Sequence, residues 1–344
     1  AISDNDAGRM VAESIFEQTM RDHLKHSDFA ILYRTNAQSR SFEEALRKHN
    51  IPYKIYGGLS FYQRKEVKDL LAYLKLVVNP KDEEALRRII NYPTRGIGKT
   101  TLEKVTVTAS RANVPIWEII SKIEHHDFSN RVQKTVREFV TMIQSFQSML
   151  EQKDAYALAS HIAASTKILK ELYNDKSVEG VSRYENLQEL LNSIKEFTDA
   201  DVNQVDIFEN APDKSLGTYL QQVMLLTDQD DKNPEVERVK LMSIHAAKGL
   251  EFPSVFVGGM EENLFPSMLS VNTRDELEEE RRLFYVAVTR AEKKLTLTYA
   301  TSRYRFGKLI FCEPSRFLEE IPSEFVEMAA LSQRSAQGNR DSYN

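Results

Sequence analysis

The 344-residue sequence is poor in cysteine, contains no long apolar run and has no excess of positive charge. Its single cysteine, Cys312, excludes an internal disulfide and is typical of a reducing cytoplasm. No apolar run approaches the roughly 20 residues of a membrane span, and we expect neither a span nor a signal peptide. The net charge of −5 argues mildly against a surface coated with DNA-binding basic side chains, so we expect any nucleic-acid site to be a local groove. The seven histidines have no metal-ligand spacing, and no metal site is predicted in this chain.

The apolar pattern predicts strands at both ends of the chain and helices between them. Apolar residues make up 41% and charged residues 28% of the sequence, which is typical of globular proteins, and the length favours two domains. Short apolar runs predict strands at Phe29–Tyr33, Tyr53–Tyr56, Lys240–Ile244, Ser254–Val257, Leu295–Tyr299 and Leu309–Phe311. Two strands cannot form a stable α/β sheet alone, so the sheet must combine both ends of the chain.

The predicted fold class is therefore α/β, a parallel sheet domain interrupted by a mostly α-helical inserted domain. The sheet domain comprises residues 1–80 and 235–330, and the inserted domain comprises 81–234. The acidic stretch 227–234 is predicted to be the returning linker, and 331–344 a disordered tail. A capping box at Ser41–Glu44 predicts a helix that ends near His49.

The segment Glu278–Leu295 begins with acidic and ends with basic residues, which predicts a helix that runs into a strand. This arrangement places Arg290 at the start of that strand. One interpretation of Arg290 is a solvated charge that pairs with Glu292 or Glu278. The other is an arginine that binds a transferring phosphoryl group with its planar fork of donors. The local pattern leaves both open.

The Gly-Lys-Thr sequence at residues 98–100 is not interpreted as a P-loop. A P-loop needs a glycine five positions before Gly98, where Pro93 stands, and it follows a strand rather than a helix. We interpret Gly96-Ile97-Gly98 as a hinge between two helices, the second of which starts near Thr100 and can offer backbone amides to a phosphate. A plain helix–helix turn is the alternative. No other stretch offers a P-loop, so the chain supplies at most half of an ATP site.

Three stretches together resemble motifs IV, V and VI of the UvrD/PcrA/Rep family of superfamily 1 DNA helicases. They are Leu32–Arg40, Val239–Val257 and Glu278–Leu295. The resemblance covers nearly the whole chain and implies the second RecA-like motor domain with its inserted helical domain. It implies a bacterial, cytoplasmic, ATP-dependent helicase that moves 3′ to 5′ on single strands and unwinds duplexes, with repair or replication proteins as partners. The N-terminal motor domain, which holds Mg²⁺ and most of the phosphates of ATP, is missing, so the fragment alone is not expected to hydrolyse ATP.

The resemblance also assigns residues to an ATP site. It matches Tyr33 to the ring that stacks on adenine, and Arg34 and Arg290 to two arginines that reach the γ-phosphate. Glu251 matches the carboxylate near the ribose hydroxyl. Without the resemblance, Tyr33 at the end of a strand is interpreted as a core residue, and Glu251 alone is more often a surface charge.

Further residues match the DNA contacts of the family. Ser243 and His245 match positions that touch single-stranded DNA, and Lys248 adds a phosphate contact. Phe306 resembles an aromatic on which a base stacks, with a buried strand-edge aromatic as its alternative. Arg64 either contacts DNA or braces the domain. The turn assigned to the duplex backbone comprises Gly96, Ile97, Gly98 and Thr100.

Two alternatives remain, one within the helicase class and one outside it. One is the helicase half of a helicase–nuclease, although no nuclease-like cluster of carboxylates and lysine follows Phe311. The other is a non-enzymatic DNA-binding or protein-docking module that kept the motor fold. The presence of both Arg34 and Arg290 favours the motor.

Overall fold

A five-stranded parallel sheet forms one end of the computed structural model, which describes residues 1–200, 213–227, 236–268 and 273–328. Its strands are β1 (Phe29–Tyr33), β2 (Tyr53–Tyr56), β3 (Val239–Ser243), β4 (Phe252–Val257) and β5 (Ala291–Leu297). They lie in the order β2-β3-β1-β4-β5, and every neighbouring pair is parallel. Strands β1 and β2 from the first part of the chain lie in one sheet with β3, β4 and β5 from the last part, which confirms that both ends build one sheet.

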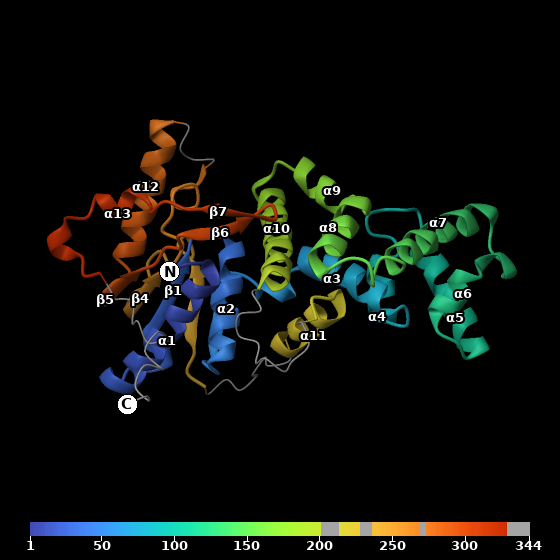
Figure 1. Ribbon diagram of the computed structural model, residues 1–344, viewed down its shortest axis with the longest axis horizontal. Coiled ribbons are helices and arrows are strands. Elements are labelled where there is room, and N and C mark those ends of the chain that lie inside the picture. The colour runs from blue at the N-terminus through green and yellow to red at the C-terminus, as the bar shows by residue number, and fades with distance from the viewer. Residues whose placement is uncertain (201–212, 228–235, 269–272, 329–344) are drawn as a thin grey trace, which may run out of the picture.

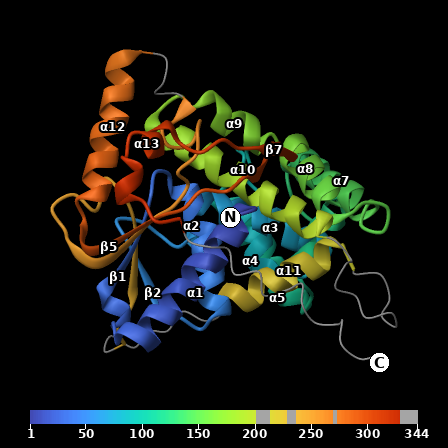
Figure 2. The ribbon, with the colours of Figure 1, turned by 60° about the vertical axis from the view of Figure 1, so that its left-hand side comes forward.

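Helices cover both faces of this sheet, as Figures 1 and 2 show. Side chains alternate along β1, so Phe29, Ile31 and Tyr33 face one side and Ala30 and Leu32 the other. The first side packs against α1 (Asp4–Asp22) and α2 (Ser39–Lys48). The second packs against α12 (Arg274–Val288) and α13 (Arg316–Glu319). All five β1 residues are buried, which explains the continuous apolar run in the sequence.

A block of helices lies beside the sheet and extends away from it (Figure 1). Its members are α3 (Lys65–Val78), α4 (Glu83–Ile89), α5 (Lys99–Ala112), α6 (Ile116–Ser121), α7 (Asn130–Gln147), α8 (Ala155–Ser165), α9 (Ile168–Asn174), α10 (Val178–Asp199) and α11 (Leu216–Thr227). Their apolar faces form one core. Because α3 contributes to that core, its packing groups it with the helical block, whereas the predicted boundary lay at residue 80. The domain boundaries stay predictions.

Two local features differ from the expectations. The helix predicted from Ser41 is α2, which begins at Ser39, and the capping box at this point pairs Thr35 with Gln38 in the short helix η2 (Asn36–Gln38). A β-hairpin follows β5, made of β6 (Ser302–Arg305) and β7 (Lys308–Phe311). Only β7 was predicted, because the alternating arginines of β6 give no apolar run. The predicted tail, and all but the first residue of the predicted linker, lie outside the described residues.

The hairpin joins the sheet region to the helical block. The Tyr304 hydroxyl donates to Asp199 Oδ2 at 2.7 Å, and the Gly307 amide donates to Asn192 Oδ1 at 3.4 Å. Gly307 has a φ of 72°, and a Cβ placed there would lie 1.6 Å from the Tyr156 hydroxyl. Only glycine fits this close approach of the hairpin to α8.

A buried cluster of charges ties α10 to α1 and α2. Arg40 is 1% exposed and contacts four carboxylates. The nitrogen–oxygen distances are 3.4 Å to Asp4, 3.4 Å to Glu44, 2.6 Å to Glu189 and 3.1 Å to Glu196. Arg303 of β6 adds contacts to Asp4 and to the buried Glu261. Acidic groups outnumber arginines in this cluster, and burial raises the pKa of Glu196 to about 9, against the opposing charge of Arg40.

We expect the stability of the chain to fall as pH rises between about 4.5 and about 9 because of Glu196. Its folded pKa lies above the ordinary value of 4.5, so the folded chain keeps a proton that the unfolded chain releases. Glu196→Gln needs no proton and still accepts from Arg40. It should flatten the pH dependence and stabilise the chain by on the order of 1 kcal/mol at pH 8 relative to pH 5. Denaturation midpoints across this range test this. Parallel curves for both proteins would contradict it, and Glu13→Gln on the surface of α1 is the control.

None of the helices in the described ranges is long and apolar enough to cross a membrane.

Candidate functional site

Arg290 lies between the end of α12 and the start of β5, as the sequence predicted. Its guanidinium donates to three oxygens: Nε to the Val286 carbonyl at 2.9 Å, Nη1 to the Leu250 carbonyl at 2.6 Å and Nη2 to Thr289 Oγ1 at 2.9 Å. No ion pair of Arg290 occurs among the described residues, so the predicted pairing with Glu292 or Glu278 is absent there. Neutral acceptors orient the guanidinium. Because no carboxylate of the described residues pairs with its positive charge, that charge is available to an anion.

Glu251 is exposed and lies beside the Arg290 anchor. It follows Leu250, whose carbonyl binds Arg290, and precedes Phe252, whose amide donates to the Arg290 carbonyl at 2.9 Å. Both Glu251 and Arg290 therefore sit where β4 and β5 begin. We call this side of the sheet the amino edge.

Arg34 lies at the opposite side, the carboxyl edge, where β1 ends. Its backbone amide donates to Gln38 Oε1 at 3.0 Å. Its side chain forms a bidentate ion pair with Glu280 of α12: Nη2 lies 2.8 Å from Oε1, and Nε lies 3.1 Å from both oxygens. The Glu280 side chain is 5% exposed and also accepts from the Ser267 amide at 3.1 Å. Sequence reasoning missed Glu280 because nothing local marks it among the neighbouring glutamates.

The structure contradicts the predicted convergence of Arg34 and Arg290. Leu32 pairs with Val257, whereas Ala291 pairs with Phe252 at the other end of β4, so the backbones of the two arginines are separated by roughly 26 Å along the strands. Arg34 follows a strand and Arg290 precedes one. In a parallel sheet these positions fall on opposite edges. The resemblance assigned both arginines to the γ-phosphate without taking the direction of the strands into account.

Tyr33 is a core residue in this structure. Its side chain is 1% exposed and packs on the α1 and α2 side of the sheet. Burial raises the pKa of its hydroxyl well above the ordinary value. The core-packing alternative therefore describes Tyr33, and the ring offers no free face for adenine.

His245 lies at the carboxyl edge with Arg34. Ser243 ends β3 opposite Tyr33, and its Oγ accepts from the Ala246 amide at 3.3 Å, which shapes the turn that presents His245. Desolvation lowers the pKa of His245, the charge of Arg34 lowers it further, and Glu280 opposes the shift. His245 is exposed, and the charges of Arg34 and Glu280 act on it. Lys248 is exposed further along the same segment.

Phe306 lies at the tip of the β6–β7 hairpin and is 58% exposed. Its φ is 51°, a left-handed conformation that the tight turn requires. The Arg305 guanidinium lies 5.6 Å from the ring centroid. The alternative of a buried strand-edge aromatic is therefore wrong. Burial raises the pKa of Glu185 in α10, and the charges of Arg34 and Arg305 both oppose the shift.

Arg64 is a buried brace, and the structure does not support the prediction that it contacts DNA. It is 7% exposed, and its donors are used inside the protein. Nη1 donates to the Asn36 carbonyl at 2.8 Å and to Asn186 Oδ1 at 2.7 Å, and Nη2 donates to Ser39 Oγ at 2.8 Å. These contacts fix the η2 turn against α10.

The glycine turn joins α4 to α5 within the helical block, far from the sheet (Figure 1). Gly98 is the N-cap of α5, and no side chain caps the amides that follow. Gly96 and Gly98 are exposed with open space at their Cβ positions, whereas Ile97 is buried and anchors the turn; Thr100 is exposed in the first turn of α5. A helix, not a strand, precedes the turn, as expected when the P-loop was rejected. The arrangement leaves backbone amides accessible to a phosphate.

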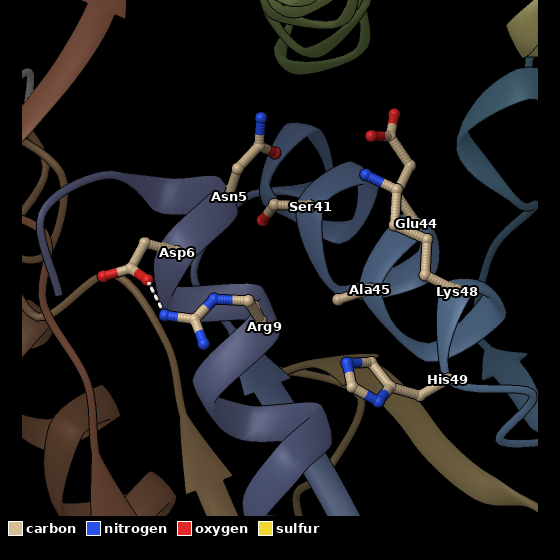
Figure 3. Close-up of a pocket in the computed structure, with 8 residues that line it drawn as sticks. All are labelled: Asn5, Asp6, Arg9, Ser41, Glu44, Ala45, Lys48 and His49. Atoms are coloured by element: carbon tan, nitrogen blue, oxygen red, sulfur yellow. Dashed lines mark hydrogen bonds and ion pairs between the residues drawn. The ribbon is translucent and has the colours of Figure 1, made fainter. Parts of the chain in front are cut away.

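The described residues fit the phosphates of a nucleotide at the amino edge but not its metal. Arg290 offers an oriented fork of donors without a carboxylate partner, which suits a phosphoryl group. In the described ranges, no cluster of three acidic, histidine or cysteine side chains could hold an ion. A hollow of about 330 Å³ lies elsewhere, between α1 and α2, and none of the predicted site residues lines it (Figure 3).

The parallel sheet, the helices on both faces and the arginine at the helix–strand junction define a RecA-like α/β domain of the helicase type. The family model for the UvrD-like helicase C-terminal domain matches residues 2–302, and the chain belongs to that family. The ATP-dependent DNA helicase PcrA of Staphylococcus epidermidis (strain RP62A) is 39% identical over 331 residues, which are 95% of this chain and 44% of that protein. PcrA of Staphylococcus aureus (strain Mu50) is 38% identical over 338 residues, 97% of this chain and 45% of that protein. The chain thus spans less than half the length of these relatives.

Proposed function

We propose that this chain is the C-terminal half of an ATP-dependent DNA helicase that moves 3′ to 5′ on single strands. The observation that carries the proposal is the position of Arg290, which is held by three neutral acceptors at the amino edge and keeps its charge. The similarity to PcrA helicases over nearly the whole chain supports the same conclusion. Repair and replication proteins in a bacterial cytoplasm are the proposed setting.

The proposed ATP site is shared with an N-terminal motor domain that binds the nucleotide and Mg²⁺. Arg290 binds the γ-phosphoryl group when the two domains close, and stabilises the charge that develops there. Glu251 accepts a hydrogen bond from a ribose hydroxyl. Arg34 and Tyr33 have no part in this site.

The proposed DNA track lies along the carboxyl edge. Ser243, His245 and Lys248 contact the single strand, and Phe306 stacks on a base. Arg34 is added to this track because it follows β1 at the carboxyl edge, next to the end of β3 and the segment that carries His245. A separate duplex contact is proposed at the turn of Gly96, Ile97, Gly98 and Thr100, where backbone amides are open to a phosphate.

Single-strand-stimulated ATP hydrolysis tests the function. We expect no turnover from this chain alone, because it has no P-loop, and DNA-dependent turnover at roughly 1–100 per second once the N-terminal motor domain is present. Phosphate release, with and without a single-stranded oligonucleotide, measures both. DNA binding without any turnover in the complete protein would contradict the proposal and favour a non-enzymatic DNA-binding module.

A further inference from the structure

Helix α12 reaches both edges of the sheet. The chain leaves β4 at the carboxyl edge, passes through α12 and enters β5 at the amino edge directly after Arg290. The 15 residues of α12 span roughly 22 Å, which is comparable with the length of the strands beneath it. A single rigid element therefore connects the two regions to which DNA and nucleotide are assigned.

The Glu280 side chain ties α12 to the carboxyl edge. Glu280 holds Arg34 through both of its oxygens, and the pair is largely shielded from solvent. The neighbouring glutamates behave differently: Glu278 pairs with Arg281 and Glu279 with Arg282, both within α12. Among these three glutamates, only Glu280 connects the helix to the end of β1.

The other end of α12 carries Arg290 with it. Arg290 Nε donates to the carbonyl of Val286 in the last turn of the helix, so any shift or rotation of that turn changes where the guanidinium points. Displacements of about 1 Å at a catalytic group cost about a hundredfold in rate. A small movement of α12 is therefore sufficient to displace the Arg290 guanidinium and change the rate of ATP hydrolysis.

A bound DNA strand would compete with Glu280 for the Arg34 guanidinium. A phosphodiester offers the same bidentate acceptors as a carboxylate, and a guanidinium that turns toward it leaves Glu280. Glu280 would then be a buried carboxylate without its partner, which is strongly unfavourable. The helix must move to restore a partner or solvent to Glu280.

We infer that the Arg34–Glu280 ion pair couples DNA binding at the carboxyl edge to the position of Arg290, through α12. Glu280 is thus a positioning residue that makes ATP turnover depend on DNA. This inference rests on the proposed function, because it assumes that DNA lies at Arg34 and the γ-phosphate at Arg290.

The test uses Glu280→Gln in the complete helicase, with Glu279→Gln as the matched control. The control changes the same side chain one residue earlier, on the exposed side of α12. We expect Glu280→Gln to reduce the stimulation of kcat by saturating single-stranded DNA about tenfold, with basal turnover and the Kd for DNA within about threefold of wild type. Glu279→Gln should keep full stimulation.

Hydrogen exchange gives a readout without nucleotide. A poly-dT oligonucleotide should change the exchange of residues 286–292 in wild type and in Glu279→Gln, and this change should be largely lost in Glu280→Gln. Arg34→Gln removes the other partner and should lose it too. The double variant should be no worse than Arg34→Gln, since residues that act through each other are not additive.

The possible outcomes separate the two ideas. Full stimulation and full exchange response in Glu280→Gln would overturn the inference and leave the proposed function intact. A wild-type protein whose turnover ignores DNA would overturn the proposed function and, with it, this inference.

Discussion

Arg290→Ala in the complete helicase is expected to lower DNA-stimulated ATP turnover by about 10³- to 10⁵-fold, the range typical of arginine fingers. The reason is geometric as well as electrostatic. Arg290 is already oriented by Val286, Leu250 and Thr289, so in the proposed ATP site it binds the phosphoryl group without reorganisation. Steady-state phosphate release measures the loss, and a fluorescent ATP analogue measures the affinity for nucleotide, which should stay within about threefold.

Two further variants define what Arg290 contributes. Arg290→Lys keeps the charge but not the planar fork, and should recover only a small part of the rate. Arg282→Ala removes an exposed arginine of the same helix, whose partner is Glu279, and should leave turnover unchanged. Turnover of Arg290→Ala within about fivefold of wild type would show that Arg290 does not stabilise the transition state.

The position of Arg290 could be predicted from the sequence because every signal is local. The acidic start of α12, the basic residues after it and the apolar alternation of β5 fix where helix and strand meet. The sheet was predictable for a similar reason: β1 is a run of five apolar residues, and only a strand buried on both faces requires one.

Contacts between distant residues could not be predicted in this way. Arg64 binds Asn186, which is 122 positions away, and Arg34 binds Glu280, which is 246 positions away. Glu280 is one of several consecutive glutamates, and only the rotation of α12 against the sheet decides which of them faces inward. The separation of Arg34 from Arg290 was within reach of the sequence, because the direction of the predicted strands already placed them on opposite edges.

Arg40→Met is expected to destabilise the chain by about 3–5 kcal/mol or to prevent its folding. Methionine has a similar volume, so little packing is lost. The carboxylates of Asp4 and Glu189 stay buried without their shared cation. Because α10 meets α1 and α2 through this cluster, the loss should appear as separation of the helical block from the sheet as well as a lower denaturation midpoint. Arg9→Met, which breaks exposed pairs with Asp6 and Glu13 on α1, should cost less than about 1 kcal/mol.

The pH dependence of Arg40→Met distinguishes lost charge pairing from lost packing. Arg303 and Arg40 outweigh burial and hold the pKa of Asp4 below its ordinary value, so wild type loses that contribution as pH falls through the folded pKa of Asp4. In the variant, the buried carboxylate of Glu189 takes up a proton more readily because the charge of Arg40 no longer opposes the effect of burial, which lowers the cost of burying Glu189 at low pH. The difference in unfolding free energy between the two proteins should therefore shrink from pH 8 to pH 5. A difference that is constant over this range would mean that Arg40 stabilises the junction of α1, α2 and α10 by its packing and not by its charge.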